Sequence, residues 1–102
     1  MAGDVFNIEV VTTGDVEVLA LRGELDVANA ERVRTRLLSS EASILVVDLE
    51  GLTFIDSSGL TALVHAHNQL TGRGRGFELR GATKGVKRVF EITGLTDFLT
   101  ET

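Results

Sequence analysis

One stretch, residues 44–60 (ILVVDLEGLTFIDSSGL), constrains the fold more than any other part of the chain. It opens with four apolar and mostly β-branched residues, a run too short for a stable helix. Such a run predicts a strand that is buried on both faces of a sheet. Helical spacing then begins after an Asp-Ser-Ser-Gly segment, and Ser or Asp in that position is a helix N-cap signal. We therefore expect a strand closed by Asp48, a second and looser apolar patch, and then a helix from Ser58 to Leu70. The inward side chains of this helix are expected to be Leu60, Leu63, Val64 and His67.

The residues before this stretch predict a β-hairpin and a helix. Apolar residues alternate over Val5 to Val11 and over Val16 to Leu21, and residues 12–15 (TTGD) between them favour a turn. Helical periodicity then covers Val27 to Leu38, and Ala30, Val33 and Leu37 form its apolar side. A loop over residues 39–43 leads into the strand at Ile44.

The residues after the second helix predict a further strand and helix. A glycine-rich loop, residues 71–76, precedes a short strand from Phe77 to Arg80. A third helix is expected over Lys84 to Thr93. Gly94, directly after it, is a typical helix-terminating glycine. The inward residues of this helix are Val86, Val89 and Phe90, and Leu95 to Leu99 predict one last helical turn.

This order of elements, β-β-α-β-α-β-α(-α), predicts an α/β fold with helices packed on a mixed β-sheet. The strand from Ile44 to Asp48 is expected to be central. With 102 residues and no linker, repeat or low-complexity segment, residues 1–102 are predicted to form a single domain.

Composition excludes several classes of function. A net charge of −5 argues against a general affinity for nucleic acid, and the absence of Trp and Tyr removes the usual stacking platforms for single strands. The chain lacks cysteine, and its apolar runs are shorter than a membrane span. We therefore expect a cytoplasmic protein that contacts neither nucleic acid nor membrane.

The sequence offers no arrangement for catalysis or metal binding. His65 and His67 are two positions apart on a predicted helix, so their side chains diverge; we expect His65 in solvent and His67 at the margin of the core. The serines lack the G-x-S-x-G frame of a hydrolase. The glycines near residue 74 precede a strand, which does not fit a phosphate-binding loop before a helix. No enzymatic activity, metal or cofactor is predicted.

The segment from Asp56 to Gly59 remains the best candidate for function. It is compatible with a simple helix cap. The same geometry also suits a phosphate, because free N–H groups and the positive end of the helix dipole lie at a helix start. A phosphate beside Asp56 and Asp26 would change the local charge sharply, as a switch for a protein contact requires.

Three motifs resemble those of STAS domains, the family of anti-sigma factor antagonists. They are residues 23–26 (GELD), residues 48–60 (DLEGLTFIDSSGL) and residues 86–95 (VKRVFEITGL). The resemblance implies a STAS-like fold and a cytoplasmic bacterial regulator. Such a regulator binds an anti-sigma factor, which is an ATP-dependent serine kinase, and so releases a sigma factor; a serine phosphatase restores the binding form.

The resemblance also assigns roles to residues. It maps the phosphorylated position onto Ser57, and Ser58 onto a neighbouring position. Asp26 corresponds to an acidic residue near the site. The expected partner surface therefore comprises Asp26, Asp56, Ser57, Ser58 and Gly59. An alternative on the same fold is an accessory subunit of a lipid-transport or membrane-transporter complex, which needs no phosphoserine.

Overall fold

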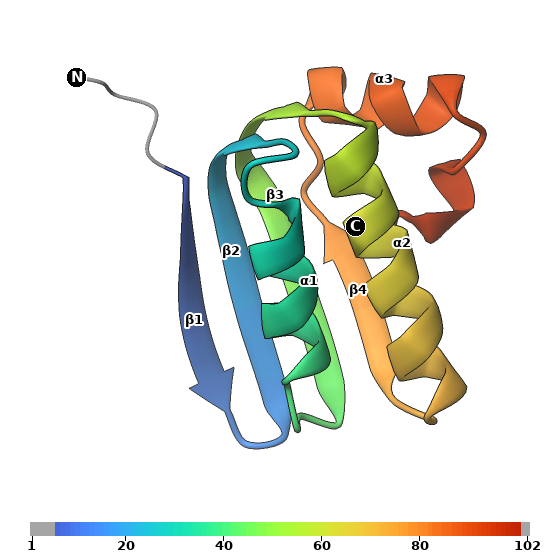
Figure 1. Cartoon of the computed structure of the whole chain (residues 1–102). Helices are drawn as coiled ribbons and strands as arrows, with labels where there is room; N and C mark the ends of the chain where they lie inside the picture. The colour runs from blue at the N-terminus through green and yellow to red at the C-terminus, as the bar shows by residue number, and fades with distance from the viewer. Residues whose placement is uncertain (1–5, 101–102) are drawn as a thin grey trace.

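A computed structural model describes residues 6–100 of the chain. It shows a four-stranded sheet with helices on one side (Figure 1). Val5, the first residue of the predicted hairpin, lies outside the described residues. The predicted order of elements is confirmed. The strands are β1 (Asn7–Thr13), β2 (Val16–Leu25), β3 (Ile44–Ile55) and β4 (Gly76–Arg80). The helices are α1 (Ala30–Leu38), α2 (Ser57–Gly72), α3 (Lys84–Ile92) and the short 3₁₀ helix η1 (Thr96–Phe98).

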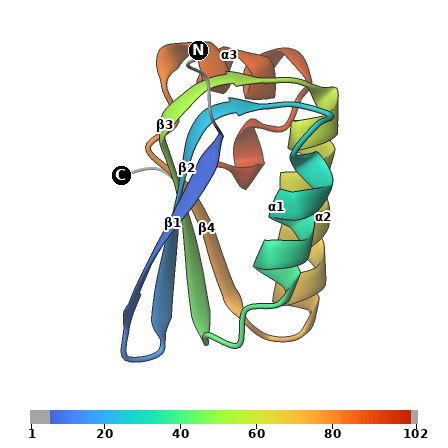
Figure 2. The same cartoon turned by 60° about the vertical axis from the view of Figure 1, so that its left-hand side comes forward.

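The strands lie side by side in the order β1-β2-β3-β4. β1 and β2 form the predicted antiparallel hairpin, whose tight turn is made possible by Gly14 at a φ of 59°. β2, β3 and β4 are parallel, and α1 and α2 are the crossovers that connect them. Both crossover helices cover the same face of the sheet (Figure 2). β3 is therefore an inner strand, as predicted.

Burial on β3 corrects the prediction of a strand buried on both faces. Leu45, Val47 and Leu49 are fully or almost fully buried, whereas Ile44 is 40% exposed and Val46 is half-buried. The reason is that the helices pack on one face only, so alternate side chains of β3 face outward. A short β-branched run suits this one-sided strand as well as a two-sided one.

β3 also runs much further than predicted, to Ile55, and it is two residues longer than β2. The pairing of β2 with β3 is interrupted after Ala20 and again after Gly23, and each interruption gives β3 one extra residue. The spacing of the buried side chains along β3 reflects these β-bulges. Every second residue is buried up to Leu49, and the next buried residues, Leu52 and Ile55, each follow after three positions. The strand bends there and arches over the end of the sheet toward α2 (Figure 1).

α1 begins three residues later than predicted, at Ala30. The carbonyl oxygen of Asp26 accepts hydrogen bonds from the N–H groups of Asn29 (3.1 Å) and Ala30 (2.9 Å). These bonds form a turn over residues 27–29 before the helix starts. The inward residues of α1 are confirmed, because Ala30, Val33 and Leu37 are buried.

α2 starts one residue earlier than predicted and ends at Gly72. Leu60 and Leu63 are buried as expected, but Val64 is only half-buried. The buried face turns instead through Ala62, Ala66 and Leu70, because α2 packs against both α1 and the sheet. Small alanines allow the two helices to approach closely.

His65 is exposed and His67 lies at the margin of the core, as predicted. The His67 ring meets the rings of Phe77 and Phe98 edge-on, with centroids 5.4 and 4.8 Å away. His67 therefore has an aromatic packing role between α2, β4 and η1.

α3 closes the end of the core where β3 arches. Val86 and Phe90 are buried there, and Val89 is half-buried. Gly94, at a φ of 76°, ends the helix: its N–H donates to the carbonyl of Glu91, and the next N–H, of Leu95, donates to the carbonyl of Phe90. This pair of bonds is a Schellman motif, so the predicted role of Gly94 is confirmed.

Candidate functional site

The candidate site lies where β2 and β3 end together. Leu25 and Ile55 are register partners at the ends of these parallel strands. The residues that follow them, Asp26 and Asp56, therefore leave the sheet at the same edge, which is where α/β proteins commonly place their sites. Both aspartates are half-buried. The structure thus brings the two carboxylates predicted for the site to one edge.

Asp56 joins β3 to α2 and fixes the direction in which the helix starts. Its side chain is the N-cap: Oδ1 accepts a hydrogen bond from the N–H of Gly59 at 3.0 Å. Its main-chain N–H donates to the carbonyl oxygen of Leu25 at 3.1 Å. The N-cap of α2 is therefore attached to the end of the neighbouring strand as well as to its own helix.

Gly59 lies where the first turn of α2 crosses the ends of the two strands. A Cβ atom at this position would lie 2.6 Å from Cγ of Leu25 and 2.9 Å from its carbonyl oxygen. It would also lie 3.1 Å from a side-chain carbon of Ile55. Gly59 is buried, so its contribution is to let the helix approach the sheet, which brings the preceding serines to the sheet edge.

Ser57 and Ser58 occupy the first two positions of α2, and they differ in exposure. Ser57 is exposed, whereas Ser58 is half-buried. The Asp56 cap satisfies the N–H of Gly59 and so leaves the first two N–H groups of the helix, those of the two serines, for other acceptors. The sequence alone did not distinguish these adjacent serines, whereas their different exposure in the structure does.

Asp26 also has a local structural role that the sequence did not reveal. Its Oδ1 accepts a hydrogen bond from the N–H of Ala28 at 3.0 Å, and its own N–H donates to Oδ1 of Asn29 at 3.0 Å. Asn29 in turn donates to the carbonyl of Glu24 at 2.9 Å. The Asp-x-x-Asn spacing was the available signal for this turn. It presents Val27, the residue directly after Asp26, to solvent as an apolar group at 76% exposure.

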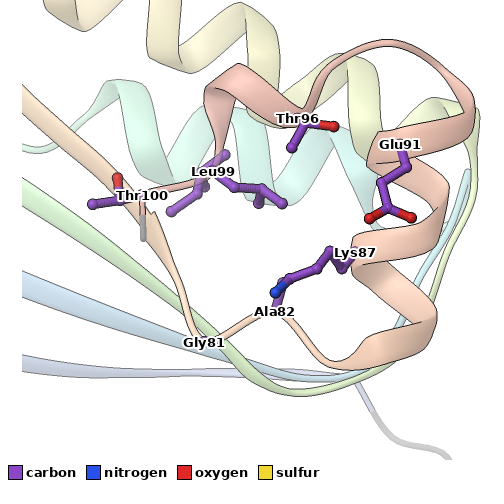
Figure 3. A pocket seen from close by; sticks show the side chains of 8 residues that line it. Gly81, Ala82, Lys87, Glu91, Thr96, Leu99 and Thr100 are labelled. Atoms are coloured by element: carbon purple, nitrogen blue, oxygen red, sulfur yellow. The ribbon is translucent and has the colours of Figure 1, made fainter. Parts of the chain in front are cut away.

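A hollow of about 330 Å³ lies away from these residues, between β4, α3 and η1 (Figure 3). Lys87, Glu91 and Leu99 are among its lining residues, and no member of the predicted site lines it. The candidate site lies outside this hollow, at the start of α2.

Residues that could hold a metal are not clustered: in residues 6–100, no group of three or more His, Cys, Asp or Glu side chains has a suitable arrangement. Within the same residues, no helix is long and apolar enough to cross a membrane. The polar groups at the site are hydroxyls, carboxylates and main-chain N–H groups, which suit recognition of a protein surface.

Comparison with known proteins gives a consistent picture. The family model of the STAS domain matches residues 7–102. An anti-sigma-B factor antagonist of Staphylococcus aureus is 31% identical over an alignment of 96 residues, which covers 91% of this chain and 89% of that protein. The crystal structure of an anti-sigma factor antagonist from Mycobacterium paratuberculosis superposes with a TM-score of 0.84 at 25% identity, covering 98% of this chain and 87% of that one. The anti-sigma factor antagonist SpoIIAA in its unphosphorylated form has a TM-score of 0.76 at 25% identity, covering 96% and 88%.

Proposed function

The chain belongs to the STAS domain family, and from this premise we propose that it is an anti-sigma factor antagonist switched by phosphorylation of Ser57. In this proposal the unphosphorylated protein binds an anti-sigma factor and thereby releases a sigma factor. Relatives named as anti-sigma factor antagonists over nearly the whole chain support the general function. The observation that carries the switch is the exposed Ser57 hydroxyl at the first position of α2.

The proposed binding surface surrounds that hydroxyl and comprises Asp26, Asp56, Ser57 and Ser58, with Gly59 setting the approach of the helix. Val27, directly after Asp26, adds an exposed apolar side chain. An apolar group within a polar rim is the usual composition of a protein interface. A protein partner therefore fits this surface better than a small molecule does.

The direction of the switch follows from electrostatics. A phosphate on Ser57 adds a charge of about −1.5 to −2 at pH 7. Its own domain tolerates that charge, because free N–H groups and the helix dipole favour an anion at a helix start. A partner surface fitted to the neutral hydroxyl next to Asp56 must instead accept a desolvated phosphate between carboxylates, or separate. Phosphorylation is thus expected to end binding and to leave the fold unchanged.

The remaining parts of the proposal concern the partners. The anti-sigma factor is proposed to be the ATP-dependent serine kinase that modifies Ser57, and a serine phosphatase to return the protein to its binding form. The protein itself acts in the cytoplasm as a binding module without enzymatic activity. It uses no cofactor in this scheme.

Phosphorylation in vitro tests the proposal. The protein is incubated with ATP and the anti-sigma kinase encoded by its own host, and the modified residue is located by mass spectrometry. We expect phosphate on Ser57, none on the Ser57→Ala variant, and normal modification of Ser58→Ala. Phosphate found on Ser58 alone contradicts the site assignment. Capture of a transporter subunit in place of an anti-sigma factor would favour the accessory-subunit alternative.

A further inference from the structure

β1 is an exposed edge strand. It pairs with β2 on one side, and within residues 6–100 no strand pairs with its other side (Figures 1 and 2). Six of its seven residues are exposed, including Val10 at 42% and Val11 at 62%. Val10 is the partner of buried Leu19 and shares its face, whereas Val11 shares the opposite face with Val18. Apolar groups are therefore exposed on both faces of one unpaired edge.

β1 lacks the features by which edge strands usually avoid association. Its sequence, NIEVVTT, contains no Pro and no Lys, and its pairing with β2 has no bulge. Its single charge, on Glu9, is paired with Arg22 at 3.2 Å. An edge strand of this kind, rich in β-branched residues and without a bulge, favours the addition of another strand.

The opposite edge of the sheet provides a contrast. β4 has five residues, of which Glu78 and Arg80 are charged. The chain beyond η1 returns to this strand, where the N–H of Thr100 donates to the carbonyl of Leu79 at 2.8 Å. One edge is thus short, charged and partly covered, whereas the edge at β1 is longer and is not covered by any part of residues 6–100.

We propose that a second copy of this chain pairs with β1 through its own β1, which joins two sheets into one of eight strands. Two-fold symmetry makes the strands antiparallel and keeps each side chain on its own face of the joint sheet. Full overlap of Asn7–Thr13 with the same strand of the partner then places the central residue, Val10, opposite itself. This inference is independent of the proposed function.

The distribution of charge favours this self-pairing and this register. With Val10 on the two-fold axis, Glu9 lies opposite Val11 of the second copy, so no like charges face each other directly. A shift of one strand by two residues in one direction places Glu9 opposite Glu9, which is unfavourable. In the favoured register the exposed valines also become neighbours across the new strand pair.

The dimer is expected to be concentration-dependent and to leave the candidate site free. Seven paired residues span only about 24 Å, so the contact is smaller than a standard interface of about 800 Å² per partner. β1 lies at the edge of the sheet remote from α2, and the start of α2 stays accessible in each copy (Figure 1).

The proposal can be tested by introducing charges at position 10, which lies on the two-fold axis, and measuring self-association by sedimentation velocity. Val10→Lys and Val10→Glu each place like charges opposite each other, and each should weaken self-association by about tenfold or more. An equimolar mixture of the two variants should associate again, because Lys then faces Glu. Ile92→Lys, at a 72% exposed apolar position on α3, is the matched control and should dimerise like the wild type. A wild type that stays monomeric up to about 1 mM, or a dimer insensitive to Val10→Lys, overturns the proposal.

Single cysteines test the register, because the chain contains none of its own. Residues directly opposite in an antiparallel pair have Cα atoms about 4.5–5.5 Å apart, within the range of a disulfide. Val10→Cys should therefore form a disulfide-linked dimer on mild oxidation. In Val11→Cys the two thiols lie on a diagonal beyond that range, although position 11 is the more exposed. Cross-linking of Val11→Cys as fast as Val10→Cys excludes the proposed register.

Discussion

The main-chain N–H of Asp56 donates to the carbonyl oxygen of Leu25, 3.1 Å away, and this bond attaches the start of α2 to the end of β2. Because Leu25 precedes Asp26, the bond also sets where the two site aspartates lie relative to each other. The Ser57 hydroxyl is therefore presented by two inner strands and a capped helix. We therefore expect the proposed phosphorylation of Ser57 to change the charge of this surface without rearranging the backbone.

The first prediction concerns the effect of charge at Ser57 on partner binding. Ser57→Asp should reduce affinity for the anti-sigma factor by about a hundredfold, because like charges at an interface cost several kcal/mol. Ser57→Ala should bind whether or not ATP is present. Calorimetric titration measures both affinities, and circular dichroism checks that the fold is unchanged. Tight binding by Ser57→Asp would mean that the partner surface does not enclose this residue.

The second prediction separates the charge of Asp26 from its hydrogen bond. Asp26→Asn keeps an oxygen that can accept from the N–H of Ala28 but removes the negative charge. We expect weaker partner binding or slower phosphorylation with a nearly unchanged thermal midpoint. Asp26→Ala also removes the acceptor and should cost about 1 kcal/mol of folding free energy. If Asp26→Asn itself lowers the midpoint substantially, the carboxylate serves the turn, and the proposed surface must be redrawn.

The third prediction uses two glycines in different surroundings. Gly59→Ala places a Cβ against Leu25 at less than 3 Å and should cost about 1–3 kcal/mol of folding free energy. Gly85→Ala is the matched control: it also lies near a helix start, but its Cβ would meet nothing within 4 Å. The control should be neutral or stabilising by up to about 1 kcal/mol. Urea unfolding gives both values, and equal effects would show that helix propensity alone decides them.

The fourth prediction concerns pH and Glu17, a largely buried acid on β2. Burial alone would raise the pKa of Glu17, but the hydroxyl of Ser40 and the guanidinium of Arg36 beside it lower the pKa below its usual value. Arg36 donates to its Oε2 at 2.9 Å. A lowered pKa in the folded state means that the pair stabilises the protein above the unfolded-state pKa of about 4.3, and that this contribution is lost as the pH falls through the folded-state value.

Glu17→Gln should therefore be less stable than the wild type by about 1 kcal/mol at pH 7. The difference should shrink as the pH is lowered from about 5 toward about 2. Urea unfolding at several pH values measures it, with Glu41→Gln as a control at an exposed acid on the loop before β3. A difference that stays constant across this range would assign the effect to packing rather than to charge.

The order of elements could be predicted because local signals agree with it. The helix ending at Gly94 has a glycine that the structure indeed places at positive φ, and the apolar face of α1 has its inward residues at regular helical spacing. These features depend on residues close in sequence. The cluster of polar residues at the start of α2 was recognisable for the same reason.

Other features were not predicted, either because they depend on distant residues or because neighbouring residues allow more than one local structure. One-sided burial of β3 requires knowing that both crossover helices lie on one face, and residues 44–47 carry no sign of it. The start of α2 was predicted one residue too late, because either Asp56 or Ser57 could have been the N-cap residue. The turn that holds Asp26 depends on Asn29, three residues away, and on the carbonyl of Glu24.

The two bulges of β3 have a consequence for how related sequences can vary in length. They place Leu52 and Ile55 on the face of the sheet that the helices cover. The number of residues between Asp48 and Asp56 therefore decides on which face of the sheet α2 begins. Loss of one residue there would remove one bulge, leave the other, and move the side chains that follow to the opposite face of the sheet. Homologous chains should therefore accept insertions and deletions at the β1–β2 turn and in residues 73–75. They should keep a constant length over residues 48–56, even though Thr53 and Phe54 within that segment are exposed.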